Sequence, residues 1–271
     1  MNFDTDNLGR EYPKLLERVL SEGKLVSPRG QLVREVRPLV FRLYNPLACV
    51  VKRTGFSTTL MYLEILQLLA GEFDHGLYEK ISPGAAKRMN TYGSYGPRSR
   101  EQLRAVEREL LRDPDSRRAV VYVGRPRDLF LADDLNMPCT MSWQFFNRDG
   151  KLEMYVYMRS WDLVWGLSYD IPCFVAVQKM LADALSLPLG EYVHVAGSGH
   201  IYERHFDLTA GATKQKLVLP KGHFVANTQE RYGLLLEAAR RVLAGDKYAL
   251  DGWLGVPDWE PLVPSLLKKL V

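Results

Sequence analysis

The chain of 271 residues contains little cysteine and no long hydrophobic run. Its three cysteines, Cys49, Cys139 and Cys173, are too few for a disulfide framework, and their spacing is not that of a zinc site. We therefore expect no bound metal and a reducing, cytoplasmic environment. No run of 18 apolar residues is present, so a membrane-spanning helix is not expected. The polar, acidic start "MNFDTDNLGREYPK" is unlike a signal peptide.

An excess of charge of one sign is also missing. The net charge is +4, and basic residues are dispersed apart from "GPRSREQLR" and "LLKKLV". This balance does not favour nucleic acid or a membrane as partner, and phosphate on a small substrate explains local arginines equally well. The sequence has no internal repeat, low-complexity tract or linker, so we expect a single domain over residues 1–271.

Apolar periodicity predicts four helices, three of which carry recognisable end signals. Gly23 ends the first, a Ser/Thr start and Gly71 bound the second, and Pro114 stops the third. The fourth is entered through Pro172, near its first turn. Residues 72–100 are rich in Gly, Pro and polar residues, which predicts a loop or lid. The helices are expected at residues 11–22, 57–71, 99–114 and 171–187.

Strand patterns are interspersed among these helices. The sequence Arg148-Asp149-Gly150 is a hairpin signal inside one of them. Helices and strands mix without regular alternation, which favours an α/β or α+β fold over a parallel barrel. The strand-like segments are residues 31–46, 116–124, 140–160 and 191–202.

Cys139 stands out among the cysteines because it follows Met137-Pro138 at the start of a predicted strand. A free cysteine is more often a small buried hydrophobe, and Cys49 within "PLACVV" fits that interpretation. A nucleophilic thiolate needs a positive charge or a proton acceptor nearby to lower its pKa. Arg159 can supply the charge if the strand pair folds back through the hairpin turn.

Five segments, in order, resemble the thymidylate synthase family, including its pyrimidine hydroxymethylase members. They span residues about 29 to 205, whereas roughly the last 60 residues match poorly. The resemblance implies a thymidylate synthase-like fold, a mixed sheet with flanking helices that dimerises through the sheet. The segments are "YLEILQLLAG", "YGSYGPRSR", "DPDSRRAVV", "MPCTMSWQFFNRDGKLEMYVYMRSWDLVWGLSYDIP" and "GSGHIYERH".

The resemblance also assigns the reacting groups. It implies that Cys139 attacks C6 of a pyrimidine and that 5,10-methylenetetrahydrofolate supplies one carbon to C5. Glu64 matches the family's glutamate, which would have a raised pKa in a cleft and relay protons through water. Tyr95 matches the tyrosine beside the nucleophile.

Several arginines match the family's phosphate ligands, and together they suit a phosphate dianion. Arg159 and Ser160 match its "RS". Arg117 and Arg118 match paired arginines that reach the phosphate from the other subunit of a dimer. Without the resemblance, two adjacent arginines would usually be interpreted as solvent-exposed charges. A further arginine is expected from the N-terminal phosphate loop. There "KRTG" contains Arg53, but the position of "SPRGQ" favours Arg29.

The remaining site residues come from two short motifs. His200 and Tyr202, in "HIY", match the pair that hydrogen-bonds the sugar, although a lone histidine near a strand end is more often structural. Asp162 and Gly166 match the "RSxDxxxG" positions near the folate.

Asp170 departs from the family's methyltransferases, which place asparagine there. An amide matches the N3–H donor and O4 acceptor of uracil, whereas a protonated carboxyl group can donate to N3 of cytosine and accept from its 4-amino group. The family's cytosine-specific hydroxymethylases carry an aspartate here. An acid at a helix entry facing solvent is the competing interpretation.

Other departures concern the product. Residues 72–94 contain no tryptophan, where methyltransferases of the family pack tryptophans against the folate. Thr140 and Met158 also replace the usual histidine and glutamine. We therefore predict a cytosine nucleotide 5-hydroxymethylase, with Cys173 favouring CMP over dCMP. The alternatives are a thymidylate synthase acting on dUMP and a non-catalytic paralogue that binds nucleotide or RNA.

Overall fold

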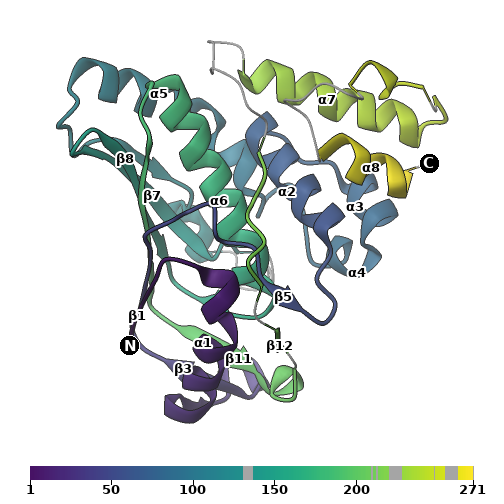
Figure 1. Cartoon of the computed structure of the whole chain (residues 1–271). Coiled ribbons are helices and arrows are strands. Elements are labelled where there is room, and N and C mark those ends of the chain that lie inside the picture. The colour runs from purple at the N-terminus through teal and green to yellow at the C-terminus, as the bar shows by residue number, and fades with distance from the viewer. Residues whose placement is uncertain are drawn as a thin grey trace.

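The computed structural model describes residues 1–130, 137–208, 210–211, 213–219, 228–246, 248–253 and 262–270 (Figure 1). The helices are α1 (Leu8–Glu22), α2 (Thr58–Ala70), α3 (His75–Ile81), α4 (Pro83–Ala86), α5 (Tyr95–Arg112), α6 (Trp165–Ala184), α7 (Thr228–Leu243) and α8 (Leu262–Leu270). The strands are β1 (Asn2–Thr5), β2 (Lys24–Val26), β3 (Val33–Val36), β4 (Leu39–Leu43), β5 (Lys52–Arg53), β6 (Val120–Tyr122), β7 (Thr140–Arg148), β8 (Lys151–Met158), β9 (Trp161–Asp162), β10 (Leu189–Ala196), β11 (Gly199–Tyr202) and β12 (Ala210–Gly211).

A mixed six-stranded sheet forms the centre of the fold, in the order β1-β4-β10-β8-β7-β6. The pairs β1–β4 and β10–β8 are parallel, and the other three pairs are antiparallel. Along β8, Leu152, Met154, Val156 and Met158 are buried, while the residues between them are half-buried or exposed. One face of the sheet therefore meets the core, where α6 packs against β8 and β10. The predicted α/β fold with a mixed sheet and flanking helices is confirmed.

The β7–β8 hairpin turns where the sequence predicts. Asp149 and Gly150 have φ values of 50° and 69°, the left-handed pair that a tight hairpin turn requires. At the other end of β7 the register shifts between Thr140 and Ser142. There the carbonyl of Met141 accepts from the N–H groups of both Val123 and Gly124, each at 3.0 Å. This bulge directly follows Cys139, so the cysteine lies where regular pairing ends.

The helix α2 is the hub of the helical layer. Ser57 caps it by accepting from the N–H of Leu60, and Gly71 ends it with φ 71°, as the sequence predicts. Nearly all its residues are buried, because α5, α6, α7 and α8 all pack against it. In Figure 1, α7 and α8 lie on the side of α2 away from the sheet. The C-terminal residues that match the family poorly thus contribute to the core around α2.

A smaller sheet, in the order β2-β3-β11-β9, lies beside α1. It joins the N-terminal strands to β11, which carries His200 and Tyr202, and to β9, which carries Asp162. The two sheets diverge after β8 and β10, because Gly197 and Ser198 separate β10 from β11.

Several predicted boundaries were wrong. α1 begins at Leu8, because Asn7 accepts from the N–H of Arg10 and so caps the helix earlier. α5 begins at Tyr95, before the predicted residue 99. Residues 72–100 are not all loop: Asp74 caps α3, whose Leu77 is buried.

The largest error concerns α6, which begins at Trp165 and contains Pro172 in its interior rather than at its first turn. The helix tolerates the proline because its other turns are anchored by burial on the sheet and on α2. As a consequence Asp170 stands inside a helix, not at a solvent-facing helix entry. No helix among the described residues is long and apolar enough to cross a membrane.

Candidate active site

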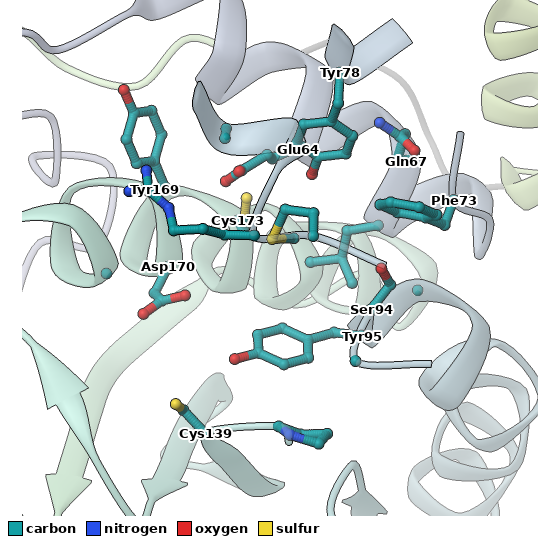
Figure 2. Close-up of a pocket in the computed structure, with 18 of the residues that line it drawn as sticks. Glu64, Gln67, Phe73, Tyr78, Ser94, Tyr95, Cys139, Tyr169, Asp170 and Cys173 are labelled. Atoms are coloured by element: carbon teal, nitrogen blue, oxygen red, sulfur yellow. The ribbon is translucent and has the colours of Figure 1, made fainter. Parts of the chain in front are cut away.

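A cavity of about 300 Å³ lies between α2, α6 and the start of α5, and the Met137–Cys139 segment forms one wall (Figure 2). The structure brings five of the predicted site residues to its lining. They come from segments far apart in the sequence. The packing of α2 against α6, and of α6 against the β7–β8 hairpin, brings these segments together. These residues are Glu64, Tyr95, Cys139, Gly166 and Asp170.

Cys139 is held in place by Arg159. The backbone N–H of Arg159 donates to the carbonyl of Cys139 at 2.9 Å. Its guanidinium donates to the carbonyls of Pro138 and Met137, both at 3.0 Å. The arginine is exposed, so it fixes the nucleophile segment and still presents its charge to solvent.

The thiol of Cys139 experiences opposing influences. Burial raises its pKa above the ordinary value, and the charges of Arg159 and Arg29 counteract this. Asp170 and Asp162, if ionised, raise the pKa further. The resting group is therefore a thiol that two arginines bias toward the thiolate.

Tyr95 lies between Cys139 and Asp170, with its hydroxyl directed toward both (Figure 2). Its ring packs against Trp143 and Phe174, at centroid distances of 6.4 and 5.9 Å. Burial raises the pKa of its hydroxyl well above the ordinary value. Tyr95 thus stays a neutral phenol, whose hydroxyl group can both donate and accept a hydrogen bond beside the thiol.

Glu64 occupies the opposite wall, on α2. Burial raises the pKa of its carboxyl group to about 8, although a hydrogen bond with Tyr78 of α3 partly offsets the rise. Figure 2 shows the Tyr78 hydroxyl beside this carboxylate. Near neutral pH, both the protonated and the ionised form of the Glu64 carboxyl group are therefore accessible, which suits a group that transfers protons.

Asp170 points into the cavity from the second turn of α6 (Figure 2). Burial raises its pKa well above the ordinary value, and the charges of Glu64 and Asp162 raise it further. Gly166, one turn earlier, leaves room for it, because a Cβ there would lie 3.0 Å from Oδ2 of Asp170. The direction of this shift favours the protonated form of the carboxyl group.

The arginines predicted for a phosphate fall into three places. Arg29 is exposed on the turn Pro28–Gly30, and its charge acts on both Cys139 and Tyr202. Arg53 is buried instead: it donates to Oγ of Ser168 and lies 4.4 Å from the ring of Trp165. Arg29 is thus the one of these two arginines whose charge is found to act on Cys139.

Arg117 and Arg118 are exposed and lie just before β6, at the edge of the large sheet. Neither lines the cavity of its own chain. Ser160 is half-buried between Arg159 and β9, also outside the cavity lining.

His200 and Tyr202 stand together on β11, with ring centroids 5.0 Å apart. Burial lowers the pKa of His200, and the nearby charge of Asp162 raises it less. The histidine is thus neutral. Asp162 itself accepts from the N–H groups of Val164 and Trp165, so it fixes the turn into α6 and does not line the cavity.

Sequence reasoning missed the aromatic wall. Trp165 lines the cavity directly before Gly166, and Phe73, Tyr78 and Tyr169 line it too. The missing tryptophan of residues 72–94 is therefore partly replaced from α6. The rings of Trp165 and Tyr169 lie 6.2 Å apart, and the guanidinium of Arg53 lies over both, 4.4 and 5.6 Å from their centroids. Only the position of Trp165 next to the "RSxDxxxG" glycine could have indicated this.

Cys173 also lines the cavity, but not near the predicted sugar residues. The ionisable groups that act on its thiol are Glu64, Asp170 and Cys49, and its sulfur lies beside Glu64 in Figure 2. The choice of CMP over dCMP therefore gains no support from Cys173. Within the described residues, no cluster of three or more His, Cys, Asp or Glu is arranged to hold a metal.

The unusual acidity of Glu64 gives a direct prediction. A carboxyl signal that disappears in Glu64→Gln should titrate with a midpoint near 8 in carbon NMR or difference infrared spectroscopy. Tyr78→Phe should raise that midpoint, because it removes the hydrogen bond that favours the carboxylate. Tyr62→Phe, a buried tyrosine on the same helix that bonds the carbonyl of Val218, is the matched control. A midpoint near 4.5 would show that the carboxyl is solvated.

Comparison with known proteins agrees with this geometry. The chain is similar to the deoxyuridylate hydroxymethyltransferase of Bacillus phage SP01, with 29% identity over 218 residues. The alignment covers 70% of this chain and 56% of the phage protein, so the chain spans about half the length of this curated relative. Residues 73–232, more than half of the chain, match the family described as thymidylate synthase. The chain belongs to the thymidylate synthase family.

Proposed function

We propose that this protein transfers the one-carbon unit of 5,10-methylenetetrahydrofolate to C5 of a cytosine nucleotide and, with water, forms a hydroxymethyl group. Membership of the thymidylate synthase family indicates that the reaction is a one-carbon transfer. The observation that carries the choice of base is the carboxyl group of Asp170, which points into the same cavity as Cys139 and whose pKa burial raises.

Cys139 is the proposed nucleophile. Its sulfur bonds to C6 of the pyrimidine after the thiol has lost its proton, and the charges of Arg159 and Arg29 favour that loss. The C5–C6 double bond opens, and its electrons become available at C5 and at N3. Tyr95, beside the thiol, is placed to stabilise the adduct by hydrogen bonding.

Asp170 is the proposed reader of the base. Cytosine has no proton on N3, so negative charge develops there once sulfur has added to C6. A neutral Asp170 can pass its proton to N3, and the resulting carboxylate then accepts from both N3–H and the 4-amino group. Uracil already carries a proton on N3, so Asp170 cannot transfer one to that atom when sulfur adds to C6. Selection should therefore be expressed more in kcat than in binding.

Glu64, on the cavity wall opposite Cys139, is proposed to direct the reaction toward a hydroxymethyl product. The folate cosubstrate supplies the carbon at the aldehyde level of oxidation. Loss of the C5 proton and release of tetrahydrofolate leave this carbon as an electrophilic methylene group on C5. Glu64, with a pKa of about 8, can take a proton from a water molecule that attacks it. Departure of the Cys139 sulfur from C6 then restores the C5–C6 double bond. Support for this outcome over methyl transfer comes from the relative, whose name is that of a hydroxymethyltransferase.

A second candidate is hydroxymethylation of a uracil nucleotide. The phage relative is a deoxyuridylate hydroxymethyltransferase by name, and a neutral carboxyl can turn to match either base edge in the bound state. Nucleotide binding without catalysis is less well supported, because the cavity keeps Cys139, Glu64 and Tyr95 together. Methylation of dUMP is less well supported, because the relative is a hydroxymethyltransferase by name.

For the nucleotide we propose a phosphate cluster and a sugar pair. Arg29, Arg159 and Ser160 would bind the phosphate, and His200 and Tyr202 the sugar. Asp162 and Gly166 would lie near the folate. The family is usually dimeric, and we propose a homodimer in which Arg117 and Arg118 of the partner subunit complete the phosphate cluster. Their exposure at the sheet edge, outside their own cavity, supports this arrangement.

The substrate proposal is tested with CMP, dCMP, UMP and dUMP, each incubated with methylenetetrahydrofolate. Mass spectrometry should find a hydroxymethyl group on a cytosine nucleotide, without stoichiometric dihydrofolate. We expect kcat/KM to favour cytosine by about ten- to a hundredfold, the equivalent of one lost hydrogen bond to a charged group. Asp170→Asn should remove most of that preference through kcat, because an amide cannot give a proton to N3.

Asp183→Asn is the matched control, since Asp183 lies on the same helix but pairs with Lys179 outside the cavity. It should keep the cytosine preference of the natural sequence. Faster turnover of uracil nucleotides by the unaltered protein would establish the second candidate. Dihydrofolate formed in step with product would establish methyl transfer instead.

The shared site is tested by mixing two inactive variants. Arg118→Ala and Cys139→Ala should each lose most activity, the first through a raised KM and the second through kcat. After subunit exchange, some heterodimers contain one site with both residues intact, so activity should recover to about a quarter at equal mixing, as statistical pairing of two subunits requires. Arg108→Ala, an exposed arginine on α5, replaces Arg118→Ala in the control mixture. No recovery despite demonstrated exchange would refute a shared site.

A further inference from the structure

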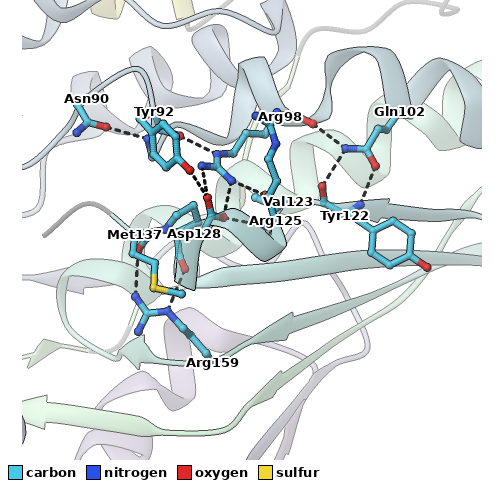
Figure 3. Close-up of polar contacts among 12 residues, drawn as sticks. Asn90, Tyr92, Arg98, Gln102, Tyr122, Val123, Arg125, Asp128, Met137 and Arg159 are labelled. Atoms are coloured by element: carbon cyan, nitrogen blue, oxygen red, sulfur yellow. Dashed lines mark hydrogen bonds and ion pairs between the residues drawn. The ribbon is translucent and has the colours of Figure 1, made fainter. Parts of the chain in front are cut away.

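A buried ion pair lies just outside the cavity, between α5 and the segment after β6 (Figure 3). Arg98 and Asp128 are each only 2% exposed, and two nearly parallel hydrogen bonds of 2.8 and 3.0 Å join them. Neither side chain lines the cavity, and neither has a part in the reaction proposed above.

Each partner of the pair also ties down backbone. Arg98 donates to the carbonyl of Tyr92 at 2.7 Å and to that of Val123 at 2.8 Å. Asp128 accepts from the hydroxyl of Tyr92 at 2.5 Å and from the N–H of Arg125 at 2.8 Å. The pair therefore fastens residues 92–98 to residues 123–128 at several points, which Figure 3 shows as one connected network.

Both fastened segments lead to reacting groups. Gly93, Ser94 and Tyr95 line the cavity, and Tyr95 is the first residue of α5. On the other side, Val123 and the adjacent Gly124 bond the carbonyl of Met141, two residues beyond Cys139. The ion pair thus spans the two chain segments from which the phenol of Tyr95 and the thiol of Cys139 project toward each other.

Stability alone does not account for such a pair. Removing two charges from water costs several kcal/mol, and well-packed apolar residues of similar size often serve as well or better. What apolar residues cannot reproduce is the fixed geometry of a guanidinium that bonds two carbonyls and a carboxylate at once.

We propose that the Arg98–Asp128 pair is a positioning device that sets the placement of Tyr95 against Cys139, and through it the rate at which the thiolate adds to the substrate. The pair touches no substrate. This inference rests on the roles proposed for Cys139 and Tyr95. Because it concerns geometry, it predicts losses in rate and in thiol reactivity, with nucleotide binding largely kept.

The test separates position from stability with a double replacement. Arg98→Met and Asp128→Leu as single changes each leave a buried charge unpaired, so both should lower the unfolding midpoint. The double variant should unfold near the natural midpoint, since no unpaired charge remains. Its kcat should nevertheless stay at least about tenfold lower, with KM changed by less than about threefold, the pattern of a displaced reacting group.

A second readout needs no substrate. Alkylation of Cys139 by iodoacetamide, followed across pH, reports how the thiol is placed among its neighbours. In the double variant we expect the rate at neutral pH to change by about threefold or more, a change of about half a pKa unit. This result is independent of whether the proposed reaction or base is correct, so failure of the proposed function is distinguishable from failure of this inference.

Two further variants keep the test decisive if the double variant does not fold. Arg98→Lys keeps the charge but loses the two-pronged geometry, so it should fold and show a lowered kcat at unchanged nucleotide affinity. Arg10→Met with Asp6→Leu removes an exposed ion pair at the start of α1 and should alter neither readout. If Arg98→Lys or the stable double variant retained full kcat and unchanged alkylation, the pair would be merely structural and the proposal overturned.

Discussion

Desolvation of two carboxyl groups in one cavity is the constraint on which the site depends. Glu64 and Asp170 come from two helices, α2 and α6, that pack against each other, and burial raises the pKa of both. The charge of Glu64 also raises the pKa of Asp170, because a second negative charge nearby disfavours ionisation. A solvated pair would be ionised at neutral pH and could neither donate to a base nor pass protons between water and substrate.

The rest of the fold maintains this condition. The helices α5, α7 and α8 pack around α2, while α6 is buried against the large sheet, so both acids are held at the wall of the cavity. Gly166 leaves the space into which Asp170 folds. Cys139 directly precedes β7 and lines the same cavity. Arg159, which directly follows β8, donates to the carbonyls of Pro138 and Met137 and so holds the segment that carries the cysteine. The acids and the thiol thus share one low-polarity space although three separate elements supply them.

Local signals in the sequence could predict much of this arrangement. Ser57 and Gly71 mark the ends of α2, Asp149-Gly150 marks the hairpin, and each acts within a few residues of itself. The beginning of α6 could not be predicted in this way, because burial across the sheet overrides the local preference of Pro172 for a first turn. The placement of Arg53 on the ring of Trp165, and of Arg29 where its charge acts on Cys139, depends on tertiary packing and could not be predicted from local sequence either. The Arg98–Asp128 pair joins residues 30 positions apart, so helix or strand periodicity in the sequence could not predict it.

The central claim is that Cys139 adds to C6 of a cytosine nucleotide while Asp170 protonates N3. It is tested most directly without folate, by following exchange of the C5 hydrogen in heavy water by proton NMR. Addition of the thiolate makes C5 basic, so each reversible cycle can replace that hydrogen with deuterium. We predict enzyme-dependent exchange in CMP or dCMP that is absent with Cys139→Ala and slowed about tenfold or more with Asp170→Asn. Exchange that is faster in uracil nucleotides, or equally fast in Asp170→Asn with cytosine, would contradict the account.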